Sequence, residues 1–87
     1  MKTNYANDDL KKAVKDAKNI LGVNEFYCFA TYVNAYGVTI TERVIRKTAN
    51  GISSYANKMF SKYGENVTVK VIYFYRNIQI TLTTYSA

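Results

Sequence analysis

Histidine and proline are absent from this 87-residue chain, and cysteine occurs once, as Cys28. Without histidine, the chain lacks the usual side-chain base at neutral pH and the commonest transition-metal ligand. Hydrolase mechanisms that require a serine–histidine or cysteine–histidine pair are therefore excluded. A single cysteine forms neither an internal disulfide nor a cysteine-rich structural zinc site. We expect Cys28, within the apolar run 25–33, to be a buried thiol.

Carboxylates and glycines are also few. The six Asp and Glu residues include the adjacent pair Asp8 and Asp9, at the start of a predicted helix where negative charge suits the helix dipole. Acids do not converge from several elements, as a two-metal site requires, and the four glycines form no phosphate-binding loop. We therefore expect no catalytic residue, no metal and no cofactor, and predict that the protein is not an enzyme.

Positive charge exceeds negative charge, with twelve Lys and Arg against six Asp and Glu and a net charge of +6. This balance favours a larger protein or nucleoprotein with an acidic surface, or DNA or RNA, as the partner. No stretch approaches the roughly 20 apolar residues that cross a bilayer, and the polar N-terminus lacks the apolar core of a signal peptide. We expect a cytoplasmic protein with no membrane partner.

The chain length predicts one compact domain, residues 1–87. Within it, residues 8–21 repeat like an amphipathic helix, and Gly22 suits its end. The apolar positions of this stripe are Leu10, Ala13, Val14, Ala17, Ile20 and Leu21. Lys11, Lys15 and Lys18 follow one flank of the stripe, and we interpret them as a secondary basic surface.

Four segments are predicted to be strands. Residues 26–33 are rich in aromatic and β-branched side chains, and residues 38–41 alternate after a polar turn. The runs 67–75 and 78–85 alternate on either side of Arg76-Asn77 and predict a hairpin. With Tyr75 opposite Ile78, one face of this hairpin is apolar, while the other carries a possible dimer or sheet-face contact formed by Ile72, Phe74 and Tyr85.

The segment 42–63 contains Asn50-Gly51, a common hairpin signal, inside a helical repeat. Either a turn divides this segment or a helix continues through the glycine. The apolar stripe keeps its phase across Gly51, and neither flank alternates as a strand must. The members of the stripe are Ile45, Thr48, Ile52, Tyr55, Ala56, Met59 and Tyr63. We therefore predict one helix over 42–63, capped by Thr39 or Thr41, with Gly51 costing about 1 kcal/mol relative to alanine.

The opposite side of this predicted helix is basic and polar, with small side chains between its charged ends. We interpret it as the main binding surface, formed by Arg43, Arg46, Lys47, Asn50, Ser54, Asn57, Lys58 and Lys62. A face built for solvation alone would more often mix Glu with Lys.

The element order α-β-β-α-β-β predicts an α+β domain of two layers, with two helices on one face of a four-stranded antiparallel sheet. We hypothesise a non-catalytic small binding protein that inhibits a larger nucleic-acid-handling protein by occluding its surface. The size and the Lys/Asn/Tyr-rich composition are typical of accessory proteins of phages or mobile elements, such as anti-CRISPR or other anti-defence factors. The alternatives are a nucleic-acid-binding domain that uses helix 42–63 on phosphates, and a self-assembling structural protein, with a homodimer possible through the sheet.

Overall fold

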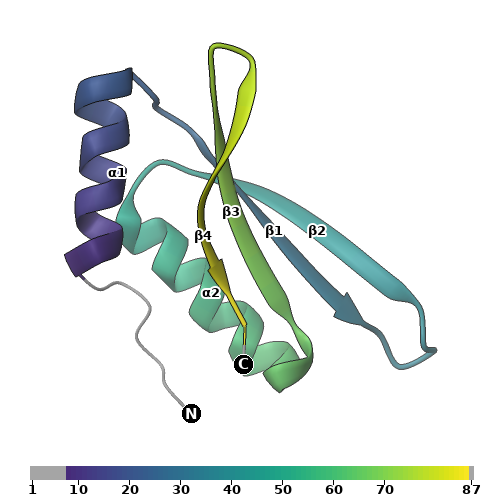
Figure 1. Ribbon diagram of the computed structural model, residues 1–87. Coiled ribbons are helices and arrows are strands. Elements are labelled where there is room, and N and C mark those ends of the chain that lie inside the picture. Colours follow the sequence, from purple (N-terminus) through teal and green to yellow (C-terminus); the bar gives the residue numbers. More distant parts are fainter. Residues whose placement is uncertain (1–7, 87) are drawn as a thin grey trace.

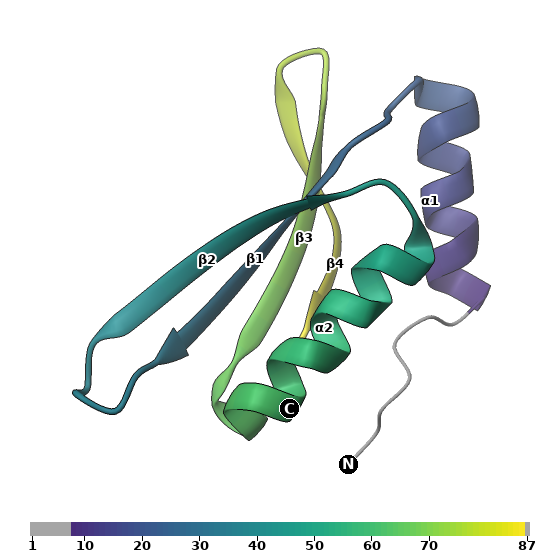
Figure 2. The ribbon, with the colours of Figure 1, turned by 180° about the vertical axis from the view of Figure 1, so that it is seen from behind.

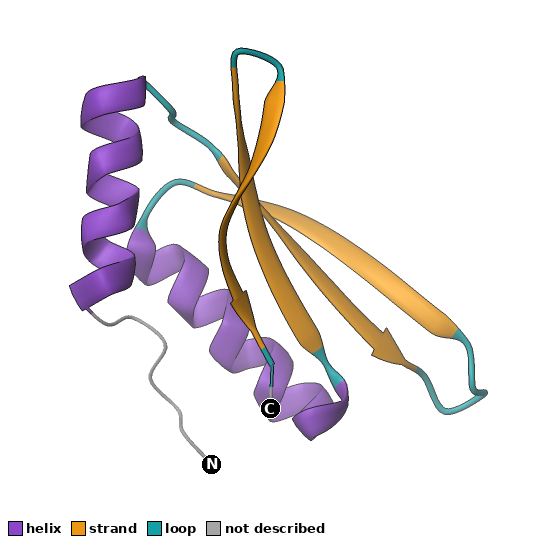
Figure 3. Ribbon diagram, in the orientation of Figure 1, coloured by secondary structure: helices purple, strands orange, loops and turns teal. Residues whose placement is uncertain are grey.

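A computed structural model describes residues 8–86 as two layers, a four-stranded antiparallel sheet and two helices (Figures 1 and 3). The elements are α1 (Asp8–Leu21), β1 (Phe26–Val33), β2 (Thr39–Arg46), α2 (Ala49–Tyr63), a short 3-10 helix η1 (Gly64–Asn66), β3 (Thr68–Tyr75) and β4 (Ile78–Tyr85). The strands lie in the order β2-β1-β3-β4. The predicted α+β class and the order α-β-β-α-β-β are confirmed.

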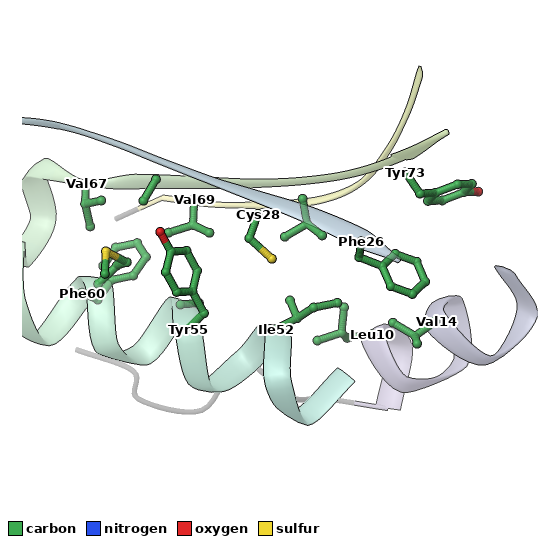
Figure 4. Packing of buried hydrophobic residues seen from close by; sticks show 14 of the residues in the cluster. Leu10, Val14, Phe26, Cys28, Ile52, Tyr55, Phe60, Val67, Val69 and Tyr73 are labelled. Carbon is green, nitrogen blue, oxygen red and sulfur yellow. The ribbon is translucent and has the colours of Figure 1, made fainter. Parts of the chain in front are cut away.

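The hydrophobic core lies between the two layers, as Figure 4 shows. Every second residue of β1 is buried there, beginning with Phe26 and Cys28, because successive side chains of a strand point to opposite faces. The helices contribute most of the predicted stripes: Leu10, Val14 and Ala17 from α1, and Ile52, Tyr55, Ala56 and Met59 from α2, with Phe60 in addition. Ile20, which was predicted to belong to the α1 stripe, is 74% exposed instead. The ring of Phe26 also meets that of Tyr73 edge to face, with centroids 5.8 Å apart.

Helix α1 has the predicted bounds and ends as its sequence indicates. Gly22, directly after the helix, has a φ of 70°, which glycine adopts without a steric penalty. The amide of Val23 then donates to the carbonyl of Ala17 at 3.1 Å, which closes the last turn. A connection of four residues, 22–25, then joins α1 to β1.

Helix α2 is shorter than predicted, because it begins at Ala49 and not at residue 42. Thr48 is the N-cap: its hydroxyl accepts a hydrogen bond from the amide of Gly51 at 3.0 Å, and its carbonyl accepts from Ile52. The predicted caps Thr39 and Thr41 lie in β2 instead. Gly51 is inside the first turn of the helix, so the prediction that no hairpin forms at Asn50-Gly51 is confirmed.

Residues 42–46, which were predicted to begin the second helix, belong to strand β2. It runs from Thr39 to Arg46, not 38–41, and each of its eight residues pairs with one of the eight residues of β1. Stopping at residue 41 would leave more than half of β1 without a backbone partner on that side. The ladder therefore outweighs the helical phase of 42–46, and the β-branched Val44 and Ile45 suit a strand. The far ends of β1 and β2 extend beyond the helices (Figures 1 and 2).

The β3–β4 hairpin has the predicted turn and a register shift farther along. Arg76 and Asn77 have φ values of 52° and 65°, as the two central residues of a type I′ turn require, and Tyr75 pairs with Ile78. Because Ile72 pairs with Thr81 and Val71 with Thr83, one extra residue, Leu82, interrupts the ladder.

This bulge corrects the predicted sheet face. Tyr85 pairs with Val69, which is fully buried on the helix side, and Tyr85 packs against the core. An uninterrupted register would have turned Tyr85 to the opposite face, together with Phe74. None of the helices described between residues 8 and 86 is long and apolar enough to span a membrane.

Candidate binding face

The outer sheet face is the side of the sheet turned away from α1 and α2, and it carries the most distinctive surface of the protein. Every strand contributes alternate residues to it, because both helices pack on the other side. Its members are Thr39, Thr41, Arg43 and Ile45 of β2; Tyr27, Phe29, Thr31 and Val33 of β1; Thr68, Lys70, Ile72 and Phe74 of β3; and Gln79, Thr81 and Thr84 of β4. No carboxylate occupies an outward position on any of these strands.

Three paired residues form a row that runs across strands β2, β1 and β3, with an aromatic side chain between two cations. Phe29 pairs with Arg43 on one side and with Lys70 on the other, so its ring stands between two cations. Arg43 and Lys70 are exposed, while Phe29 is partly buried. Neighbouring strands are about 4.8 Å apart, which separates the backbones of Arg43 and Lys70 by about 10 Å. The row therefore presents a flat apolar centre with positive charge at both sides.

The adjacent row holds a second aromatic group. Tyr27 pairs with Ile72, and its ring meets that of Phe74 edge to face with centroids 5.6 Å apart. Ile72 is only 3% exposed although no helix covers this face, and it lies outside the core between the layers. Its neighbours on the same face are Tyr27 and Thr81, which pair with it, and Lys70 and Phe74 along β3. Phe74 itself remains 50% exposed.

A groove of about 550 Å³ opens where these aromatic residues reach the end of the sheet. Tyr27 and Phe74 line it together with the loop that follows α1 and with two cations, Lys47 and Arg76. Glu25 contributes a carboxylate to this groove, and the Tyr27 hydroxyl donates a hydrogen bond to it at a distance of 3.5 Å. The outer sheet face and the groove thus form one continuous surface with Tyr27 and Phe74 in common.

The predicted basic helix face is wrong in its first third, because these residues belong to β2 and the following connection. Arg43 lies on the outer sheet face, whereas Arg46 faces the helices. The Arg46 guanidinium sits 5.5 Å from the centroid of the Tyr55 ring and donates to its neighbour's carbonyl, that of Ile45, at 3.0 Å. Lys47 follows β2 and lines the groove. The three cations therefore point to three different places.

The remaining predicted residues stay on α2. Asn50, Ser54, Lys58 and Lys62 are exposed there and Asn57 is partly exposed, so a polar surface persists with two lysines instead of five cations. Lys62 lies 5.2 Å from the ring centroid of its neighbour Tyr63.

On α1, the secondary basic surface has Lys11 and Lys15 exposed and Lys18 partly buried. Lys12, which the predicted flank did not include, lies 4.0 Å from Asp16 in an exposed pair. Such pairs contribute little to stability.

The sequence predicted the outer sheet face only in part. Ile72 and Phe74 lie on it, but Tyr85 does not, and the sequence-based choice missed Tyr27, Phe29 and Lys70. The signal was present in the alternation of residues 26–33, where Tyr27 and Phe29 share a parity opposite to that of Phe26 and Cys28. What the sequence did not give was the pairing of β1 with β3, which brings these residues beside Lys70 and Phe74.

A cluster of two tyrosines and a glutamate lies on the helix side. The rings of Tyr32 in β1 and Tyr63 at the end of α2 stack with centroids 3.7 Å apart and 15° between their planes. Both hydroxyls donate to Glu42 of β2, at 2.5 Å from Tyr32 and 3.5 Å from Tyr63. The hydrogen bond to Glu42 raises the pKa of Tyr32 above its ordinary value. These contacts tie α2 to the β1–β2 hairpin.

Two further groups are buried in the core with raised pKa values. Burial raises the pKa of the Cys28 thiol from 9.0 to about 11, although the nearby Arg46 acts in the opposite direction. Burial also raises the pKa of Tyr55, whose hydroxyl has no hydrogen-bond partner among the described residues. Cys28 and Tyr55 are therefore neutral at physiological pH, and neither group is prepared to act as a nucleophile or a base.

Residues 8–86 contain no group of three Cys, Asp or Glu side chains arranged to hold a metal ion. No protein-family model, curated protein sequence or solved structure matches the chain.

Proposed function

We propose that the protein is a non-catalytic binding protein that contacts a negatively charged partner through its outer sheet face and acts by occluding that partner. One observation carries this proposal: Phe29 lies between the exposed cations Arg43 and Lys70, the aromatic pair of Tyr27 and Phe74 lies beside this row, and no strand places a carboxylate on the face. Aromatic residues and arginine are the side chains that contribute most to binding at interfaces.

The chemistry of the titratable groups supports a binding role over a catalytic one. The groups with shifted pKa values, Cys28, Tyr32 and Tyr55, are on the helix side of the sheet and favour their neutral forms. Each has a structural explanation in burial or in the contact with Glu42. The outer sheet face, in contrast, carries threonine hydroxyls, of which those of Thr31 and Thr41 are hydrogen-bonded to each other at 3.2 Å and keep further acceptor capacity for a partner.

A narrower form of the proposal is an anti-defence inhibitor, of anti-CRISPR type, encoded by a phage or mobile element and acting in the host cytoplasm. In this form the occluded partner is a larger nucleic-acid-handling protein or its nucleoprotein complex. What supports it is the small size, the positive charge and a binding face without a catalytic group. Inhibition of such an enzyme would be stoichiometric, because a protein that only covers a surface does not turn over.

The test uses three baits in an extract of the cells that express the protein: the wild type, Arg43→Glu/Lys70→Glu, and Lys58→Glu/Lys62→Glu. The two variants change the net charge equally, but on opposite sides of the molecule. We expect the first variant to lose a partner that the second retains, with thermal unfolding showing both to be folded. If both variants retain the same partners, or if the α2 variant alone loses them, the outer sheet face is not the contact surface.

A further inference from the structure

The aromatic residues of the outer sheet face stand on the two central strands. Tyr27 and Phe29 belong to β1 and Phe74 to β3, and these strands are neighbours. Two residues along a strand correspond to about 7 Å, so Phe29 is about that far from Tyr27 on the same face. Phe74, diagonal to Tyr27, places a third ring beside them. Planar groups can therefore be received at several points along one path.

The rings near the groove are held in place before any partner arrives. The rings of Tyr27 and Phe74 meet edge to face with centroids 5.6 Å apart, beside Ile72, which is 3% exposed. A side chain that is already packed loses little further rotamer freedom on binding, whereas ordering a mobile one costs about 0.5–1.5 kcal/mol. The half-exposed ring of Phe74 can thus contact a ligand at small entropic cost.

Cations lie at both ends of this aromatic path. Arg43 and Lys70 stand on either side of Phe29, and Lys47 and Arg76 line the groove at the end where Tyr27 and Phe74 lie. Glu25, which lines the groove, carries the opposite charge to these four cations. An elongated polyanion laid over Phe29, Tyr27 and Phe74 would meet positive charge at both ends of this aromatic path.

A single strand of nucleic acid satisfies all of these features together. Its unstacked bases offer π-faces to aromatic rings, and its phosphates pair with lysine and arginine. A duplex keeps its bases stacked inside, so it would leave Tyr27, Phe29 and Phe74 unused. A second copy of the chain would bring the four cations of one face against those of the other, which is repulsive.

We propose that the outer sheet face binds single-stranded nucleic acid, with Tyr27, Phe29 and Phe74 stacking on bases and Arg43 and Lys70 contacting phosphates. The inference rests on the proposed function, because it names the partner of the same face. Lys47 and Arg76 extend the phosphate contacts at the groove. Occlusion then means covering a single strand that another protein needs to reach.

The experiment measures fluorescence anisotropy with labelled single-stranded DNA and RNA of about 12 nucleotides. A duplex of the same length and polyglutamate serve as competitors. We expect both strands to bind with micromolar or tighter affinity, and both competitors to be weak. Phe29→Ala and Phe74→Ala should each weaken binding by about 5- to 150-fold, the loss expected for removing one stacked base contact.

Salt dependence identifies the phosphate contacts. Arg43→Gln/Lys70→Gln should reduce the slope of log affinity against log salt by about 1.4, since each phosphate contact to a single strand contributes about 0.7. The matched pair Lys58→Gln/Lys62→Gln removes the same charge from α2 and should leave the slope unchanged. Equal effects of the two pairs would mean general attraction of a polyanion and would overturn the proposal.

The remaining outcomes separate the partner from the face. Phe29 is partly buried, and Phe29→Ala could fail to fold for that reason alone. In that case the half-exposed Phe74 decides the question, with Phe74→Ala measured at a temperature where thermal unfolding shows it to be folded. Tighter binding of duplex or polyglutamate than of single strands overturns the inference. If no strand binds, while the Arg43→Glu/Lys70→Glu bait still loses a protein partner from nuclease-treated extract, the inference fails and the proposed function stands. A dimer that Phe74→Ala dissociates assigns the face to a second copy and overturns both.

Discussion

The buried hydroxyl of Tyr55 allows a prediction in which removing an atom stabilises the protein. Tyr55 is 3% exposed, and its hydroxyl has no hydrogen-bond partner among the described residues. A hydroxyl that leaves water without gaining a partner costs about 1–3 kcal/mol. Tyr55→Phe removes that hydroxyl and leaves the ring in its site between α2 and the sheet.

Two contacts of Tyr55 set the size of the expected gain. The Arg46 guanidinium, 5.5 Å from the ring centroid, also interacts with the face of phenylalanine, so this contact survives. The space vacated by one oxygen atom forfeits some packing, which offsets part of the gain. We therefore expect Tyr55→Phe to raise the free energy of unfolding by about 1 kcal/mol, or the melting temperature by about 4–8 °C for a domain of this size.

A second tyrosine provides the matched control. Tyr32→Phe also deletes one hydroxyl, but one that donates to Glu42 at 2.5 Å. Its removal leaves the carboxylate with one donor fewer, so the melting temperature should fall. Far-UV circular dichroism, followed during heating and in urea, measures both variants. A lower midpoint for Tyr55→Phe would show that its hydroxyl has a partner in solution and would refute the reasoning.

Two further predictions concern the start of α2 and the core thiol. Thr48→Ala removes the acceptor for the Gly51 amide and should lower the free energy of unfolding by about 1 kcal/mol in urea denaturation, whereas Thr48→Ser should retain most of it; equal loss in both variants would exclude the cap as the cause. Burial raises the pKa of Cys28 from 9.0 to about 11, so between these pH values the native state keeps a proton that the unfolded thiol loses. The contribution of this thiol to the free energy of unfolding is complete below pH 9 and decreases as the pH rises to 11. The urea midpoint should fall over this range, and less steeply in Cys28→Ala; an identical fall would assign the effect to other groups, such as the tyrosines.

The sequence predicted those elements whose periodicity is unambiguous. The helix over 8–21, the strand over 26–33 and the hairpin turn at Arg76-Asn77 occur where the alternation and the glycine signal place them. The prediction of a helix over residues 42–46 was wrong, because Ile45 and Thr48 fall on the helical stripe by coincidence. The interaction that decides the structure of this segment is its pairing with β1, which the helical repeat does not reveal. Local periodicity carries no information about such a partner.

The candidate site was harder to predict for the same reason. A binding residue in a sheet is defined by its neighbours on other strands, and the row of Arg43, Phe29 and Lys70 joins three separate segments. The bulge at Leu82 adds a second obstacle, because one unpaired residue reverses the orientation of all that follow it. Nothing in the alternating run 78–85 marks where that residue falls, so Tyr85 was assigned to the wrong face.

The one-sided core of this sheet has an evolutionary consequence. Along β1, residues 26, 28, 30 and 32 are constrained by packing against the helices, while residues 27, 29, 31 and 33 make no contact with the core between the layers and are less constrained. A lineage can therefore exchange one target for another through changes at every second codon, with the scaffold preserved. Related chains that share this fold should differ most on the odd-numbered positions of that strand.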